Sequence, residues 1–127
     1  MRDKTCFNSI DGLVLTAIVC QPDIDIRLWI GFIDCYYRMV LSYEEFNESF
    51  DKLQRSGMII YENDKMKCTE KAQKLLTGRN RMGVLNWIFK VQERLEIIPF
   101  EDSCDVRFGI SKESYTHQLN MYRASLK

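Results

Sequence analysis

The sequence predicts a mainly helical protein that contains one small β-hairpin. Over most of the chain, apolar residues recur at spacings of three and four, which is the period of an α-helix. Residues 58–68 break this pattern, because they join β-branched and aromatic residues to the turn-prone pair Asn63-Asp64 and then alternate polar with apolar residues. Residues suited to helix N-caps precede several of the periodic stretches.

Length and composition agree with one domain, or with one domain that has an elaborated end. The chain has 127 residues, of which 46% are hydrophobic, and this is enough to form a core. No apolar run approaches the ~20 residues that cross a bilayer, and the start of the chain lacks the apolar centre of a signal peptide. We therefore expect a cytoplasmic protein with no membrane partner.

Cysteine and histidine usage does not indicate metal, disulfide or catalytic chemistry. The five cysteines are widely spaced without a CxxC pair, and His117 is the only histidine. We expect reduced, mostly buried thiols and no metal or other cofactor. The chain also lacks a glycine-rich phosphate loop and a GxSxG turn, so we do not expect an enzyme.

The first two helices are expected at 9–21 and within 23–40. The first is apolar and stops before Pro22, and the second has Asp23 or Asp25 as its N-cap. The apolar arc of the second helix is wide, and its aromatic residues are Trp29, Phe32, Tyr36 and Tyr37. This arc either packs under the C-terminal part of the chain or forms a surface for a partner or small ligand. Asp34, within this stretch, is either hydrogen-bonded or exposed on a polar edge.

The third helix has the clearest boundaries. Ser42 and Glu45 form a capping box at its start, and Gly57 stands where a left-handed C-cap is expected. Its core face is formed by Phe46, Phe50 and Leu53.

The hairpin follows directly and leads into a fourth helix. We expect it to be held against the preceding helices through Ile59 or Ile60 and through Met66 or Cys68, because two short strands are not stable alone. Thr69 caps the next helix, which Gly78 closes. The core face of that helix is expected to be Ala72, Leu75 and Leu76.

Two further helices are expected near the C-terminus, separated by an irregular stretch that contains Pro99. The last helix is capped by Ser111. The apolar stripe of the earlier helix is Val84, Ile88, Val91 and Leu95, and that of the last helix is Tyr115, Leu119, Tyr122 and Leu126. These stripes either build a two-fold homodimer or pack back onto the second helix.

Residues 41–76 resemble the third helix and wing of bacterial winged helix-turn-helix regulators of the MarR and PadR types. In those families a helix ends in leucine, three polar residues and glycine, as 53–57 do here, and a wing leads into a Thr-Glu-Lys helix start, as at 69–71. The resemblance implies a winged-helix domain over 9–78 followed by a C-terminal helical extension over 79–127. It also implies a transcriptional regulator that binds duplex DNA.

The resemblance places the third helix in the major groove and the wing against the DNA backbone or minor groove. Asn47 suits adenine, and Lys52 or Arg55 suits guanine or phosphate. The implied DNA contacts are Tyr43, Asn47, Lys52 and Arg55 on the helix, and Asn63, Lys65 and Lys67 on the wing.

Charge favours an alternative function. In the third helix, Glu44, Glu45, Glu48 and Asp51 outnumber Lys52 and Arg55, whereas surfaces that approach phosphates rely on lysine and arginine. Residues 22–64 hold nine acidic and four basic residues, and 65–94 hold two acidic and eight basic ones. The alternative is a winged-helix protein-interaction module that does not bind DNA and whose acidic third helix meets a basic partner.

Overall fold

The computed structural model describes residues 6–21, 23–102 and 108–126 and is mainly helical, with one antiparallel two-stranded hairpin. In chain order the elements are α1 (Ser9–Cys20), α2 (Ile26–Tyr37), α3 (Tyr43–Arg55), β1 (Ile59–Glu62), β2 (Lys65–Cys68), α4 (Glu70–Gln73), the 3₁₀ turn η1 (Arg79–Arg81), α5 (Val84–Glu96) and α6 (Lys112–Ser125).

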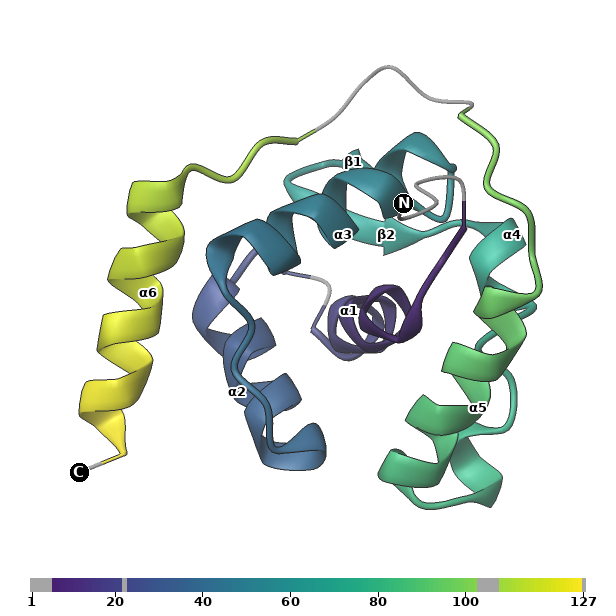
Figure 1. Cartoon of the computed structure of the whole chain (residues 1–127), viewed down its shortest axis with the longest axis horizontal. Helices are drawn as coiled ribbons and strands as arrows, with labels where there is room; N and C mark the ends of the chain where they lie inside the picture. The colour runs from purple at the N-terminus through teal and green to yellow at the C-terminus, as the bar shows by residue number, and fades with distance from the viewer. Residues whose placement is uncertain (1–5, 22, 103–107, 127) are drawn as a thin grey trace.

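Helix α1 forms the centre of the molecule. In Figure 1 it lies between α2 and α5, with α3 and the hairpin above it, and α6 lies outside α2. Because neighbours surround α1, every residue from Asp11 to Ile18 is buried. A Cβ at Gly12 would lie 2.8 Å from the Cα of Gln92 in α5, so the close approach of α1 and α5 requires glycine at this position.

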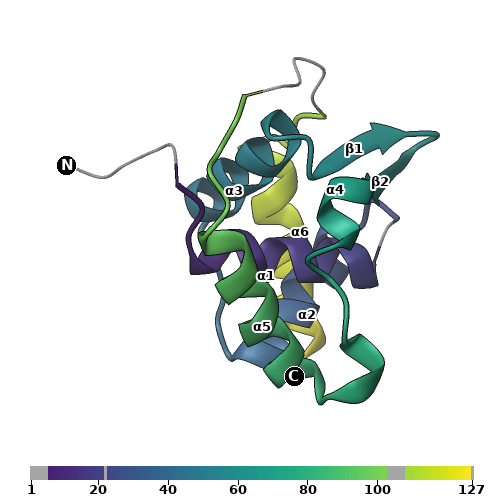
Figure 2. The ribbon, with the colours of Figure 1, turned by 90° about the vertical axis from the view of Figure 1, so that its right-hand side faces the viewer.

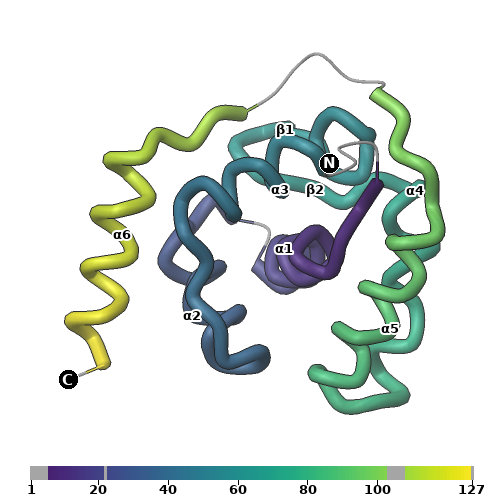
Figure 3. The backbone as a smooth tube through the Cα atoms, in the orientation of Figure 1, coloured from purple at the N-terminus to yellow at the C-terminus, as the bar shows by residue number. Residues whose placement is uncertain are grey.

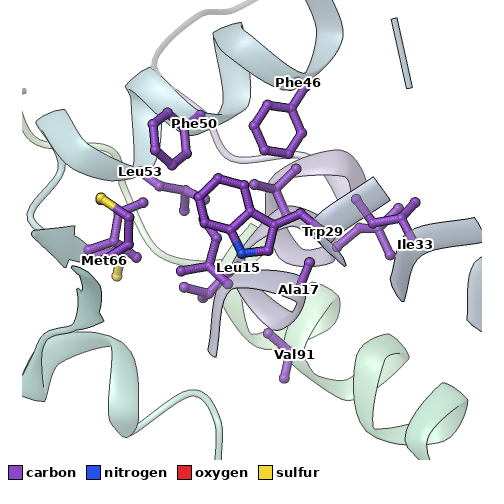
Figure 4. Packing of buried hydrophobic residues seen from close by; sticks show 14 of the residues in the cluster. Leu15, Ala17, Trp29, Ile33, Phe46, Phe50, Leu53, Met66 and Val91 are labelled. Atoms are coloured by element: carbon purple, nitrogen blue, oxygen red, sulfur yellow. The ribbon is translucent and has the colours of Figure 1, made fainter. Parts of the chain in front are cut away.

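The core is built around the indole of Trp29. Its ring stacks on Phe46 and lies 5.6 Å from the ring centroid of Phe50, both on α3. Figure 4 shows Leu15 and Ala17 of α1 on the other side of the same indole. The indole Nε1 donates a 2.7 Å hydrogen bond to the carbonyl of Gln21, which satisfies its polar atom within the core.

The predicted helix starts are confirmed at four positions. Asp25 caps α2, Ser42 and Glu45 form the capping box of α3, Thr69 caps α4, and Ser111 caps α6. These caps depend on residues three apart in the sequence, which is why local patterns were sufficient to find them.

The fourth helix is shorter than expected, because it ends at Gln73 and does not continue to Gly78. Beyond it, the carbonyls of Leu75 and Thr77 accept hydrogen bonds from Arg94 of α5, at 3.1 and 2.8 Å. The carbonyl of Leu76 accepts one from the indole of Trp87 at 2.9 Å. Side chains of α5 thus donate hydrogen bonds to the carbonyl groups of 75–77, and these bonds stabilise the turns that follow α4.

The hairpin has the expected position and register, with Ile59 paired to Cys68 and Glu62 to Lys65. Asn63 and Asp64 both have positive φ, at 52° and 62°, as a two-residue type I′ turn requires. Ile59 and Met66 are the fully buried anchors, whereas Ile60 and Cys68 are half-buried. Figure 2 shows the hairpin projecting from the helical body.

The C-terminal helices pack back onto the first helices. Helix α5 lies along α1, and α6 lies along α2. The predicted packing of the last helix on the second is therefore confirmed, and the homodimer stays a prediction. Tyr115 is the only residue of its predicted stripe that is fully buried, while Leu126 is exposed. Trp87 and Gln92, which the predicted stripe of α5 omits, are buried beside Ile88, Val91 and Leu95.

A buried ion pair joins α1 to α3. The Lys52 ammonium lies 2.8 Å from Oδ2 of Asp11 and also donates to the carbonyl of Cys6 at 3.1 Å, and the two side chains are 8% and 1% exposed. Oδ2 of Asp11 accepts a further hydrogen bond from the backbone N–H of Asn8, which completes the capping box of α1. The predicted contact of Lys52 with guanine or phosphate requires an exposed side chain, and this placement of Lys52 is therefore wrong.

Removing one partner of this ion pair should destabilise the protein strongly, because the other charge stays buried. We expect Lys52→Met to lower the free energy of unfolding by about 3 kcal/mol or more. The exposed pair of Lys90 with Glu93 provides the matched control, and Lys90→Met should change the free energy of unfolding by less than about 1 kcal/mol. Urea unfolding followed by tryptophan fluorescence measures both, and equal losses in the two variants would contradict the assignment.

Candidate functional site

The face of α3 that lies away from α1 is covered by the C-terminal part of the chain. The Gln54 amide exchanges two hydrogen bonds with the backbone of Phe108, donating from Nε2 at 3.0 Å and accepting at Oε1 at 2.7 Å. The Tyr43 hydroxyl donates to the carbonyl of Ile110 at 2.8 Å. The segments that contact α3 are 97–102 and 108–111, and in Figure 3 they lie on either side of α3 in the upper part of the view.

Arg55 also takes part in this covering. Its guanidinium binds the carboxylate of Asp102, with Nε at 3.1 Å, and lies 5.5 Å from the ring centroid of Phe100. Asp51 is a further carboxylate at 3.8 Å. Hydrogen bonding to Asp102 raises the pKa of Arg55, so the guanidinium stays charged and is held by carboxylates of its own chain.

The structure thus separates the four helix residues that the sequence groups as DNA contacts. Lys52 lies in the core, and Arg55 is bound to Asp102. Tyr43 is half-buried, with its ring 5.9 Å from that of Tyr115. Asn47 is half-buried, with no hydrogen bond recorded to the described residues. One surface that presents all four side chains together does not form.

The predicted hairpin residues are exposed, but carboxylates accompany both lysines. Asn63 stands at the tip of the turn. Lys65 lies 3.6 Å from Asp23, and Lys67 lies 3.1 Å from Glu62. The Tyr61 hydroxyl donates to a third carboxylate, that of Asp64, at 3.0 Å. The hairpin therefore carries no excess of positive charge.

The start of α3 has an acidic edge, formed by Glu44, Glu45 and Glu48, which are all exposed. Together with Ser49, these residues line a hollow of about 130 Å³ whose other walls are Asn8, Ile10 and Asp11. The Ser49 hydroxyl is buried and has no hydrogen-bond partner in the part of the chain that the structure describes. Glu45 is held by its cap, and Lys112 approaches Glu44 at 3.5 Å.

A larger hollow lies along α2, and we call it the α2 groove. Its volume is about 660 Å³, and its wall along α2 includes Leu28, Phe32 and Tyr36. The other lining residues come from the end of α1 (Cys20, Gln21), from α2 (Arg27, Gly31, Cys35), from η1 and the start of α5 (Arg79, Val84), and from the end of α6 (Tyr122, Ser125). No aspartate or glutamate belongs to this lining set.

Tyr122 of α6 is held in the groove wall by a hydrogen bond to α2. Its hydroxyl donates to Oδ2 of Asp34 at 2.6 Å. Asp34 is thus a hydrogen-bonded group within the apolar arc, one of the two alternatives left open by the sequence. The bond favours the neutral phenol and raises the pKa of Tyr122 to about 12.

No protein family, curated protein or solved structure matches this chain. None of the helices within the described ranges is long and apolar enough to cross a membrane. Among these residues there is also no cluster of three or more histidine, cysteine, aspartate or glutamate side chains that could hold a metal ion.

The sequence indicated only one wall of the α2 groove. The predicted ligand surface, one of two alternatives, was the aromatic set Trp29, Phe32, Tyr36 and Tyr37. Phe32 and Tyr36 do line the groove, whereas Trp29 lies in the core. Arg79 and Ser125 reach the groove from distant parts of the chain, and no local pattern connects them to α2.

The pKa of Tyr122 provides a test of the contact between α2 and α6. Because the folded pKa is raised, the stability that this bond adds is present below the usual tyrosine pKa of about 10 and is lost as pH rises through about 12. In Asp34→Asn, one phenol should ionise at lower pH in an ultraviolet titration. Tyr115 is the internal reference, because burial raises its pKa to about 12 independently of Asp34. An unchanged titration would contradict the contact.

Proposed function

We propose that this chain is a winged-helix protein-interaction module whose third helix does not read DNA. The observation that carries the proposal is the covering of α3, in which Gln54, Tyr43 and Arg55 are all bound by residues that follow α5. A recognition helix must leave one face free to enter the major groove. Here α1 takes one face of α3, and the C-terminal part of the chain takes another.

The order of elements supports the winged-helix part of the proposal. Three helices are followed by a hairpin and a further helix start, and 38–42 form the turn between α2 and α3. In the order of elements, the hairpin has the position that the wing has in the resembling regulators. The order of elements and the local motifs support the winged-helix assignment. They do not define the function, because one fold can serve several functions.

Electrostatics support the interaction part of the proposal. Affinity for DNA comes largely from lysine and arginine that replace counterions along the phosphates. Near α3, by contrast, the exposed charges at the start of the helix are Glu44, Glu45 and Glu48. Both lysines of the hairpin already lie near carboxylates. A partner with basic side chains suits this surface better than phosphate does.

The hollow on the acidic edge defines where such a partner would bind. A lysine or arginine side chain entering it would meet the carboxylate of Glu44 and would give the Ser49 hydroxyl a hydrogen-bond donor. That hydroxyl has no partner among the described residues, and the free energy of a hydrogen bond would be gained in the complex.

The absence of DNA binding is tested with a generic labelled duplex. Its binding is measured by fluorescence anisotropy at low and at moderate salt. We expect binding weaker than ~10⁻⁴ M even at low salt, which is below the usual range for DNA-binding proteins. Micromolar binding whose salt dependence corresponds to several phosphate contacts would overturn the proposal.

A fluorescent oligo-arginine peptide tests the binding of a basic partner. We expect it to bind the wild-type protein and to bind the variant Glu44→Gln about threefold more weakly, because charge pairs at a rim contribute modestly. Glu96→Gln is the matched control, since Glu96 is an exposed carboxylate at the end of α5. Equal losses in both variants would show that the peptide senses only overall charge.

The second candidate function is a dimeric DNA-binding regulator that uses other basic residues. It is favoured by a hollow of about 620 Å³ whose charged lining residues are Arg79, Arg81 and Arg94. Lys71 and Lys74 lie on the same stretch after the hairpin and are exposed. If the duplex does bind, Arg81→Gln should weaken binding and lower its salt dependence, whereas Asn47→Ala should not.

A further inference from the structure

The α2 groove combines an apolar wall with positive charge. Leu28 and Tyr36 are 45% and 41% exposed, and the ring of Phe32 lies 5.0 Å from that of Tyr36. These three residues span two helical turns, or about 12 Å along the axis. Large apolar side chains left open to solvent in a hollow are typical of a ligand site.

The charge in the groove comes from Arg27 and Arg79. Neither guanidinium has an ion pair or hydrogen bond within the described ranges, although the whole chain has as many acidic as basic residues. Arg79 lies 5.5 Å from the ring centroid of Trp87, which fixes its position beside the groove. Among the residues that the structure describes, the only carboxylate that contacts a lining side chain is that of Asp34, and its contact is with the hydroxyl of Tyr122.

We propose that the α2 groove binds a small single-chain acyl anion. The acyl chain lies along Leu28, Phe32 and Tyr36, and the anionic head group is bound by Arg79, Arg27 or both. Guanidinium groups form strong, charge-assisted hydrogen bonds with carboxylates. A volume of about 660 Å³ also lies within the ~300–1,000 Å³ of small-molecule sites.

This inference does not depend on the proposed interaction function. The acidic edge that would meet a basic partner belongs to the start of α3. The two hollows share no lining residue, so one proposal can fail while the other holds.

Decanoate is the first probe, below its micellar concentration, with decyltrimethylammonium as the ligand of equal tail and opposite charge. We expect decanoate to bind in isothermal titration calorimetry and to change the fluorescence of Trp87, the ring that Arg79 faces. Decyltrimethylammonium should bind at least tenfold more weakly. Equal binding of the two would overturn the anionic assignment, and absence of decanoate binding at millimolar concentration would overturn the site.

Protection of a thiol locates the ligand. Cys35 is exposed and lines the groove, so decanoate should slow its alkylation. Cys6 is also exposed but is not among the groove residues, and its rate should be unchanged. Burial raises the pKa of Cys68 to about 12, so that thiol should react slowly in either case. Equal protection of Cys6 and Cys35 would overturn the location.

Variants identify the head-group site. Arg27→Gln with Arg79→Gln should weaken decanoate binding about tenfold or more, whereas Arg79→Lys alone should retain part of the affinity. Lys90→Gln is the matched control, because Lys90 is an exposed cation on α5 outside the groove. Circular dichroism confirms that each variant is folded. Unchanged affinity in the double variant would overturn the proposal.

A final arm separates a free acyl anion from a membrane surface. Vesicles of anionic phospholipid have the same two chemical features, an acyl chain and a negative head group. We expect decanoate to bind in solution and the vesicles not to retain the protein in sedimentation. Retention by vesicles without any binding of decanoate would replace the small-ligand assignment with a lipid surface.

Discussion

The buried ion pair between Asp11 and Lys52 determines how the first and third helices sit together. A charged side chain can be buried only when its partner and hydrogen bonds are supplied by the fold. Here they are supplied by the carbonyl of Cys6, by Asp11 at the start of α1 and by Lys52 of α3. The carboxylate of Asp11 also belongs to the cap of α1, so the same group begins one helix and orients another. Because the lysine points inward, the rotation of α3 about its own axis is fixed.

That rotation decides which side chains of α3 remain for function. With Lys52 on the inner side, the amide of Gln54 and the hydroxyl of Tyr43 meet the chain that follows α5, and each finds a backbone group there. A helix that resembles a recognition helix in sequence is thus covered on two sides, and the residues that stay exposed at its start are Glu44, Glu45 and Glu48. The apolar surface left open lies elsewhere, along α2, where α6 covers one side and leaves the groove beside it.

Local patterns predicted much of the fold, and long-range partners account for what they missed. Ser42 with Glu45, and Asn63 with Asp64, act within a few residues, so their caps and turn could be read directly. Lys52 and Asp11 are 41 positions apart, and Gln54 and Phe108 are 54 apart. The sequence around Lys52 would look the same if its side chain faced water, because Asp11 is distant along the chain. The charged side of the groove was missed for the same reason, since Arg27 and Arg79 come together only in the folded chain.

The contact at Gly12 bears on how relatives of this chain could be recognised. At that point the helix backbone of α1 lies against the backbone of Gln92, and even a methyl group would meet a main-chain atom of α5. A smaller side chain at 92 could not relieve such a contact, because the obstructing atom belongs to every residue type. Homologous chains that keep this helix pairing should therefore have glycine at 12 regardless of how far the rest of their sequence has diverged. Substitution there would mark a shifted α5, and with it a different wall for the groove.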